Sequence, residues 1–177
     1  MVAYKLETRY NGEGKLELLA RLNLEPNMSQ ADIVVLNRLG EIELLVEVKP
    51  RLGMKREWAA QTRHNLSSHG LLGAAPYFLM TLPDRFYLWK DAPENMMVLS
   101  DFDIDPRSFL APYWGNAGVS DPELSGGGFE LVVRAWLTSL LWSRDISEAV
   151  SENGIWVAES GLWEAINQGQ IAHLATV

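Results

Sequence analysis

Two short aliphatic segments on either side of a Leu-Gly pair constrain this fold more than any other feature of the sequence. Residues 31–38 read Ala-Asp-Ile-Val-Val-Leu-Asn-Arg, and residues 41–49 read Glu-Ile-Glu-Leu-Leu-Val-Glu-Val-Lys before Pro50. Such runs bounded by turn residues are typical of strands, and the short connection predicts a hairpin. A turn centred on Leu39-Gly40 then places Asp32 almost opposite Glu47, at the same end of the strand pair.

The second of these segments also predicts which side chains share a face. Successive side chains of a strand point to opposite faces of the sheet. One face therefore carries Glu41, Glu43, Leu45, Glu47 and Lys49, and the other carries Ile42, Leu44, Val46 and Val48. Glu47 and Lys49 consequently point the same way, at the end of the hairpin that also holds Asp32.

The chain of 177 residues, 47% of them hydrophobic, is long enough for one substantial core and short for two. We expect a single domain, 1–177, with a core motif region at about 30–90, a loop-rich connection at 91–127 and C-terminal helices at 128–177. The expected fold class is α/β (α+β), with a mixed central β-sheet flanked by helices.

The other elements follow from hydrophobic periodicity and from glycine and proline positions. In chain order they are extended segments at 4–10 and 15–24, a helix at 54–69 closed by Gly70, strands at 76–82 and 85–90, a short helix at 106–110, a helix at 128–144 and a short helix around 162–166. We expect Trp89 and Trp136 in the core, and 126–128 as a flexible lead-in to a helix.

Composition excludes several classes of protein. Without cysteine there is no disulfide framework, no thiolate zinc site and no cysteine nucleophile. No run of eighteen apolar residues occurs and the first residues mix in charges, so neither a membrane span nor a secretory signal is expected. These features favour a soluble, cytoplasmic protein.

Charge is unevenly distributed along the chain. The formal net charge of -8 argues against broad affinity for nucleic acid, because phosphate binding draws on clustered Lys and Arg. Basic side chains nevertheless gather just after the Asp32–Glu47 pair: Lys49, Arg51, Lys55, Arg56 and Arg63. Of these, Arg51, Lys55, Arg56 and Arg63 are the candidate nucleic-acid contacts. A solvated helix face is the alternative interpretation.

The acidic residues of the hairpin suit phosphodiester chemistry. Hydrolysis of a phosphodiester needs a divalent ion to activate water, and hard cations such as Mg²⁺ select oxygen ligands. Gln30-Ala-Asp32 followed after fourteen residues by Glu47-Val-Lys49 resembles the motif of the PD-(D/E)xK superfamily of restriction-endonuclease-like nucleases. The segment Gln61-Thr-Arg-His-Asn65 is similar to the Gln-x-x-x-Tyr pattern of some members, with Asn65 in place of Tyr.

The resemblance, which spans about residues 30–90, implies a restriction-endonuclease-like core and an Mg²⁺- or Mn²⁺-dependent endonuclease acting on DNA in prokaryotic defence, repair or mobile-element biology. It implies that Asp32, Glu47 and the Val48 carbonyl ligate the metal, that Lys49 assists the attacking water, and that Gln61 supports the site. Homodimers are common in this superfamily, so a homodimer or a partner protein is a further expectation.

Two departures from the family pattern leave alternatives open. Ala31 replaces the Pro of the motif, and the usual acidic residue on a preceding helix has no clear counterpart; Glu7, Glu13 and Glu17 are the candidates. One alternative is a catalytically degenerate member of the fold that acts as a binding or assembly module for protein or nucleic acid. Another is a small acidic scaffold in which Glu47 and Lys49 form only a surface ion pair.

Overall fold

A mixed β-sheet forms the centre of the protein. The computed structural model describes residues 31–70, 72, 75–116 and 126–172. The described strands are β1 (Ile33–Leu36), β2 (Ile42–Val48), β3 (Tyr77–Thr81), β4 (Phe86–Lys90), β5 (Phe102–Ile104) and β6 (Gln170–Ile171). They are ordered β5-β4-β3-β2-β1-β6, and β2 and β3 are the parallel pair. The extended segments predicted at 4–10 and 15–24 lie outside the described residues.

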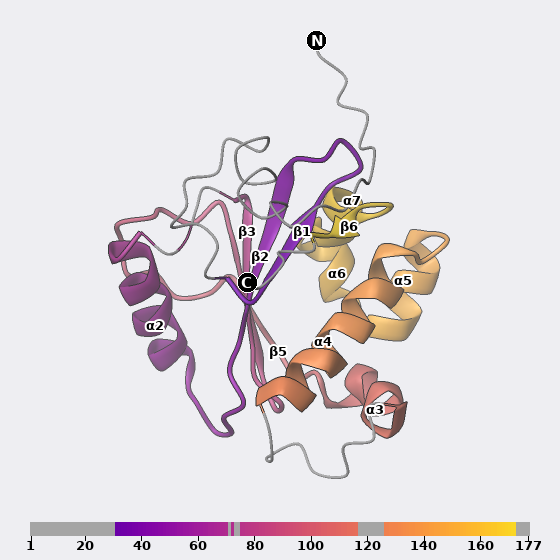
Figure 1. The fold of residues 1–177 in the computed structure, drawn as a ribbon, viewed down its shortest axis with the longest axis horizontal. Coiled ribbons are helices and arrows are strands. Elements are labelled where there is room, and N and C mark those ends of the chain that lie inside the picture. Colours follow the sequence, from indigo (N-terminus) through magenta and orange to yellow (C-terminus); the bar gives the residue numbers. More distant parts are fainter. Residues whose placement is uncertain (1–30, 71, 73–74, 117–125, 173–177) are drawn as a thin grey trace, which may run out of the picture.

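Helices cover both faces of this sheet (Figure 1). The described helices are α2 (Arg56–Ser68), α3 (Arg107–Asn116), α4 (Gly126–Leu141), α5 (Ile146–Asn153), α6 (Trp156–Glu159) and α7 (Leu162–Ile166). In Figure 1, α2 stands on one side of the sheet and α3 to α7 stand on the other. The expectation of a mixed sheet flanked by helices is confirmed.

The two faces of the sheet bury two separate cores, as the period of a strand requires. On the α2 side, Val34, Leu45, Met80 and Trp89 pack with Ala59 and Ala60 of the helix. On the other side, Leu44, Val46 and Leu79 pack with apolar residues of α3 to α7, among them Trp136. The predicted alternation along β2 is confirmed from Leu44 to Val48, but Ile42 packs on the α2 side because the register with β1 shifts between Val35 and Leu36. The predicted burial of Trp89 and Trp136 is confirmed.

The β1–β2 hairpin has the predicted register from Ile33 to Val35 and shifts by one residue at Leu36, which pairs with Ile42. Ile33 pairs with Val46 and Val34 with Leu45, which places residue 32 opposite residue 47. The turn is fixed by Asn37, whose Oδ1 accepts from Leu39 N at 2.9 Å and from Glu41 N at 3.1 Å. Gly40 has a φ of +83°, a conformation that glycine adopts without steric cost.

The helix predicted at 54–69 and the strands predicted at 76–82 and 85–90 are present as α2, β3 and β4. Several elements differ from expectation. The segment at 91–127 holds β5 and a helix, α3, that extends to Asn116 with Pro112 inside it. Helices α5 and α6 and strand β6 were not predicted, and 126–128 belong to α4. Within the described residues, no helix is both long enough and apolar enough to cross a membrane.

Candidate functional site

The strand pairing brings Asp32, Glu47 and Lys49 to one end of the sheet. Asp32 immediately precedes β1, Glu47 is the penultimate residue of β2, and Lys49 follows that strand. Glu47 is only 5% exposed, which is rare for a glutamate without a partner. These three residues therefore form a partly enclosed charged cluster, and not a set of solvated strand residues.

Each carboxylate of this cluster is bonded through one oxygen. Asp32 Oδ2 accepts a hydrogen bond from Val48 N at 2.7 Å, across the strand pair. Glu47 Oε1 accepts from Lys49 Nζ at 2.5 Å. Among the described residues, none donates a hydrogen bond to Asp32 Oδ1 or to Glu47 Oε2.

The backbone below the cluster is held by the neighbouring strand. Lys49 N donates to Thr81 O at 2.9 Å, and Thr81 Oγ1 donates to Glu47 O at 3.2 Å. Thr81 is fully buried. The end of β2 is thus pinned to β3 on both sides of Val48, whose predicted role as a carbonyl ligand stays a prediction.

Burial raises the pKa of both carboxyl groups above their ordinary values. For Asp32, the Val48 N–H and the Lys49 charge lower the pKa less than burial raises it, while Glu130 adds to the increase. For Glu47, the bond from Lys49 lowers the pKa and the Asp32 charge raises it. Two desolvated carboxylates that repel each other are stabilised by a nearby cation.

The donor set fits a hard divalent cation in part. Two carboxylate groups at one strand end offer the oxygen ligands that Mg²⁺ and Mn²⁺ prefer. Among the described residues, no group of three or more Asp, Glu, His or Cys side chains is arranged to hold a metal. The candidates for a third ligand, Glu7, Glu13 and Glu17, lie outside the described residues. Water commonly fills the remaining positions around Mg²⁺.

Helix α4 brings two charged residues that sequence reasoning did not identify. Arg134 Nη2 donates to the backbone carbonyl of Asp32 at 2.8 Å, and Arg134 Nε donates to Glu130 Oε1 at 2.8 Å. Their Glu-x-x-x-Arg spacing predicts an ion pair along α4, since residues four apart are neighbours on a helix, but it does not predict the contact of Arg134 with Asp32.

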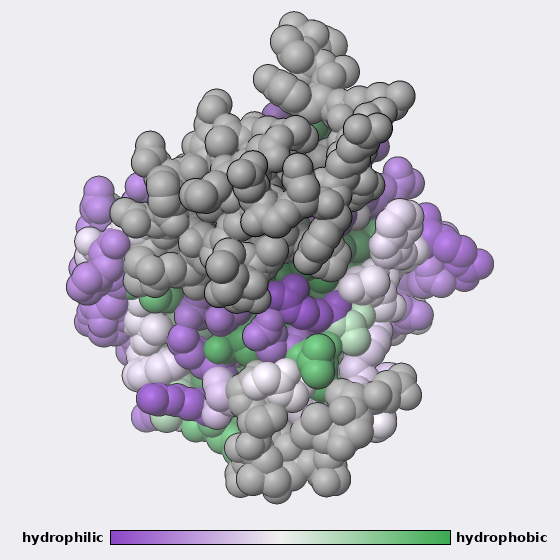
Figure 2. All heavy atoms as spheres, viewed as in Figure 1, coloured by the Kyte–Doolittle hydropathy of each residue, from purple (hydrophilic) through white to green (hydrophobic). Residues whose placement is uncertain are grey.

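The predicted basic surface on and before α2 is smaller than its sequence suggests. Arg51 and Lys55 are exposed. Arg56 bonds both Oγ and the carbonyl of Ser100 and is only partly exposed. Figure 2 shows hydrophilic residues along the outer side of this helix, and Gln61 is one of its exposed residues. Gln61 Nε2 donates to Asn65 Oδ1 at 2.9 Å, within the helix.

Arg63 requires a correction to the predicted nucleic-acid contacts. It is 5% exposed, and its Nη2 donates to Ala92 O at 3.0 Å and to Pro93 O at 3.3 Å. Its guanidinium also lies 5.8 Å from the ring centroid of Trp89, a cation–π contact. The guanidinium of Arg63 is thus bonded within the protein and is not displayed on the outer surface of α2.

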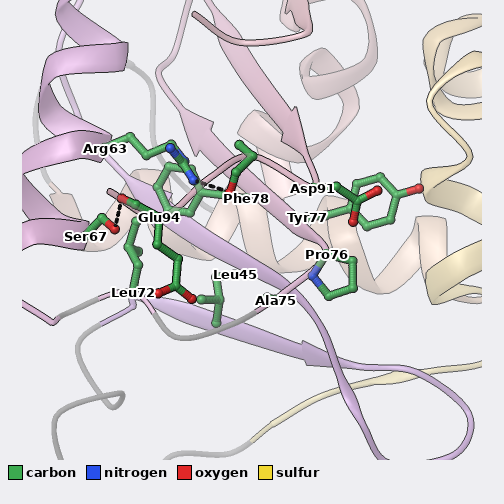
Figure 3. Close-up of a pocket in the computed structure, with 11 residues that line it drawn as sticks. Leu45, Arg63, Ser67, Leu72, Ala75, Pro76, Tyr77, Phe78, Asp91 and Glu94 are labelled. Carbon is green, nitrogen blue, oxygen red and sulfur yellow. Dashed lines mark hydrogen bonds between the residues drawn. The ribbon is translucent and has the colours of Figure 1, made fainter. Parts of the chain in front are cut away.

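A cavity of about 430 Å³ lies beside Arg63, and its lining includes Ser67, Tyr77, Asp91 and Glu94. Figure 3 shows Arg63 and Ser67 reaching toward it from α2, with Ser67 bonded to Glu94. Tyr77 begins β3, whereas the carboxylate cluster lies where β2 and β3 end. The cavity is therefore separate from the candidate site.

Comparison of the chain with protein-family models, with curated proteins and with solved structures finds no match. The candidate site accordingly rests on this chain's own sequence and geometry.

Proposed function

We propose that this protein is a metal-dependent nuclease with a restriction-endonuclease-like core, which hydrolyses phosphodiester bonds of DNA. The observation that carries the proposal is the juxtaposition of Asp32 and Glu47, each with one oxygen unbonded by described residues, beside Lys49. Burial disfavours the charge on both carboxylates, and a bound Mg²⁺ or Mn²⁺ would add positive charge to that of Lys49.

In this proposal each residue of the cluster has a separate role. Asp32 and Glu47 hold the cation, with the Val48 carbonyl as a further ligand. A bound cation supplies Lewis acidity toward the phosphate and lowers the pKa of water. Lys49, about one-third exposed at its side chain, faces both the carboxylates and solvent, and its ammonium stabilises negative charge that develops on phosphate oxygens.

Substrate contacts in this proposal come from the segment between β2 and α2. Arg51 and Lys55 are exposed there, and the segment is fixed to β4 and to the turn before it. Gly53 N donates to Asp84 Oδ2 at 2.9 Å, and Tyr87 Oη donates to Met54 O at 2.7 Å. Basic side chains on an anchored loop next to the cluster are suited to hold a phosphate backbone.

The test uses variants that preserve the fold. Asp32→Asn keeps an oxygen that can accept from Val48 N and removes the charge, while Lys49→Ala removes the ammonium. With plasmid and single-stranded DNA in Mg²⁺ or Mn²⁺, we expect cleavage by the wild-type protein, and a loss of at least about a hundredfold in either variant. Glu152→Gln, at an exposed acid of α5, is the matched control and should cut normally.

Two outcomes contradict the nuclease proposal. Cleavage that survives both Asp32→Asn and Lys49→Ala would place the chemistry elsewhere. An absence of cleavage, together with Mn²⁺ binding that Asp32→Asn abolishes, would instead support the second candidate function.

That second candidate is a catalytically degenerate nuclease fold that acts as a binding or assembly module, either as a homodimer or with a partner protein. The observation that favours it is that two of the predicted phosphate contacts make bonds within the protein, since Arg56 bonds Ser100 and the buried Arg63 bonds the carbonyls of Ala92 and Pro93. The net charge of -8 favours it too. Mobility-shift titration with DNA separates a nuclease from a module that binds only protein partners. The nuclease binds DNA, and such a module does not.

A further inference from the structure

A guanidinium group from α4 reaches the backbone of the candidate site. Arg134 Nη2 donates to the carbonyl of Asp32 at 2.8 Å, over a sequence separation of 102 residues. Its Nε donates to Glu130 Oε1, one helical turn earlier, at 2.8 Å. The planar guanidinium thus bonds the backbone just before β1 through one nitrogen and a glutamate of its own helix through another, a forked geometry that an ammonium cannot reproduce.

The helix that carries Arg134 is firmly seated in the protein. Its inward side chains are all fully buried in the core on that face of the sheet: Val132, Val133, Trp136 and Leu137. Interiors of this density resist displacement, so a side chain presented by α4 has a well-defined position relative to the sheet. Through its bond to Asp32, Arg134 therefore fixes the position of that residue relative to the rigid core.

Asp32 is held at two points by these contacts. Its side chain is bonded by Val48 N at 2.7 Å, and its carbonyl is bonded by Arg134. The residue precedes the first residue of β1, where regular strand pairing has not yet begun. A cation site depends on ligand placement within about half an ångström, and its supporting residues provide that precision.

We propose that Arg134 is a positioning residue for the Asp32–Glu47 cation site, and that Glu130 holds its guanidinium in place. The inference rests on the proposed function, because it presumes that these carboxylates bind a cation. Residues that orient metal ligands typically change metal affinity by about 10–100-fold when they are replaced. Arg134 acts through Asp32 and touches neither cation nor substrate in this assignment.

The experiment measures Mn²⁺ affinity by isothermal titration calorimetry on the full chain, at a temperature where circular dichroism shows every variant folded. We expect Arg134→Met to weaken Mn²⁺ binding about tenfold. Arg134→Lys, which keeps the positive charge but has only one donor nitrogen, should recover part of that loss. Arg144→Met is the matched control, because Arg144, in the connection before α5, also pairs with a glutamate four residues away, Glu148, and its side chain is 82% exposed. Its affinity should match wild type.

Glu130→Gln provides a second route should Arg134→Met fail to fold. It leaves Arg134 intact and weakens only the ion pair, so we expect a loss of about threefold. In cleavage assays, both variants should lower kcat with little change in KM, since neither residue contacts DNA.

The outcomes separate the two proposals. Wild-type protein that binds Mn²⁺ no better than Asp32→Asn overturns the proposed function and this inference together. Wild-type binding that Asp32→Asn abolishes, with unchanged affinity in both Arg134→Met and Glu130→Gln, overturns the positioning role alone. A fall in melting temperature without a fall in affinity also overturns it, since that is the behaviour of a purely structural brace.

Discussion

Helices α2 and α4 lie on opposite sides of the sheet and use their arginines in opposite ways (Figure 1). The sequence around α2 is basic, yet Arg63 is directed into the protein and bonds the carbonyls of Ala92 and Pro93. The sequence of α4 is apolar along one stripe, yet Arg134 reaches the end of β1 that carries Asp32. The position of an arginine in the sequence therefore says little about whether its side chain makes contacts within the core or contacts the candidate site.

The largest effect that the comparison predicts is on stability, at Arg63. Arg63→Met removes the donors of Ala92 O and Pro93 O and the cation–π contact with Trp89. We expect the free energy of unfolding to fall by about 2–3 kcal/mol. Urea denaturation checks this, with Arg38→Met at an exposed turn as the control. A loss below about 0.5 kcal/mol would show that these contacts of Arg63 do not stabilise the fold.

The difference between the helices also shows what could be predicted from sequence. The hairpin register followed from local signals, the strand alternation and a short turn, and these suffice to place Asp32 opposite Glu47. The contact of Arg134 with Asp32 joins residues 102 positions apart and depends on how α4 packs, so no local pattern could show it. The inward direction of Arg63 likewise depends on the distant loop at 92–93.

An effect of intermediate size is expected on the affinity for DNA, at the exposed basic residues before α2. Arg51→Ala and Lys55→Ala should each weaken DNA affinity about three- to tenfold, and each should lower the slope of log K against log salt by about 1. Arg63→Met should leave that slope unchanged in protein that is still folded. Fluorescence anisotropy between low and moderate salt measures both quantities. If the salt slope falls with Arg63→Met but not with Arg51→Ala or Lys55→Ala, then Arg63, and not the two exposed residues, contacts DNA.

The short strands at the sheet edges could not be predicted from the sequence for a different reason. Strand β5 has three residues and β6 has two, and both exist through pairing with β4 and β1. Helix α5 did carry a local signal, because Asp145 Oδ1 accepts from Glu148 N at 2.9 Å in the first turn. That Asp-x-x-Glu spacing is a helix-start pattern, and it could have been recognised.

The smallest effect predicted here concerns pH and the charge on Asp32. Burial raises the pKa of Asp32 above its ordinary value of 3.8, so the folded protein binds its proton more tightly than the unfolded chain does. The contribution of this group to stability is therefore fully present below pH 3.8 and is lost as pH rises through the folded pKa. Asp32→Asn, which has no such proton, should be slightly more stable than wild type at pH 7 in EDTA.

Thermal unfolding at pH 3.5 and pH 7, with and without Mg²⁺, checks this expectation. The advantage of Asp32→Asn at pH 7 in EDTA should shrink at the acidic pH, because the wild-type carboxyl group is then protonated as well. It should also shrink or reverse when Mg²⁺ is added, because a cation bound only by the folded wild-type protein stabilises it by mass action. Glu152→Gln, at an exposed acid, should show neither trend. A variant less stable than wild type at pH 7 in EDTA would mean that the bond from Val48 N, and not the burial of charge, dominates the energetics of Asp32.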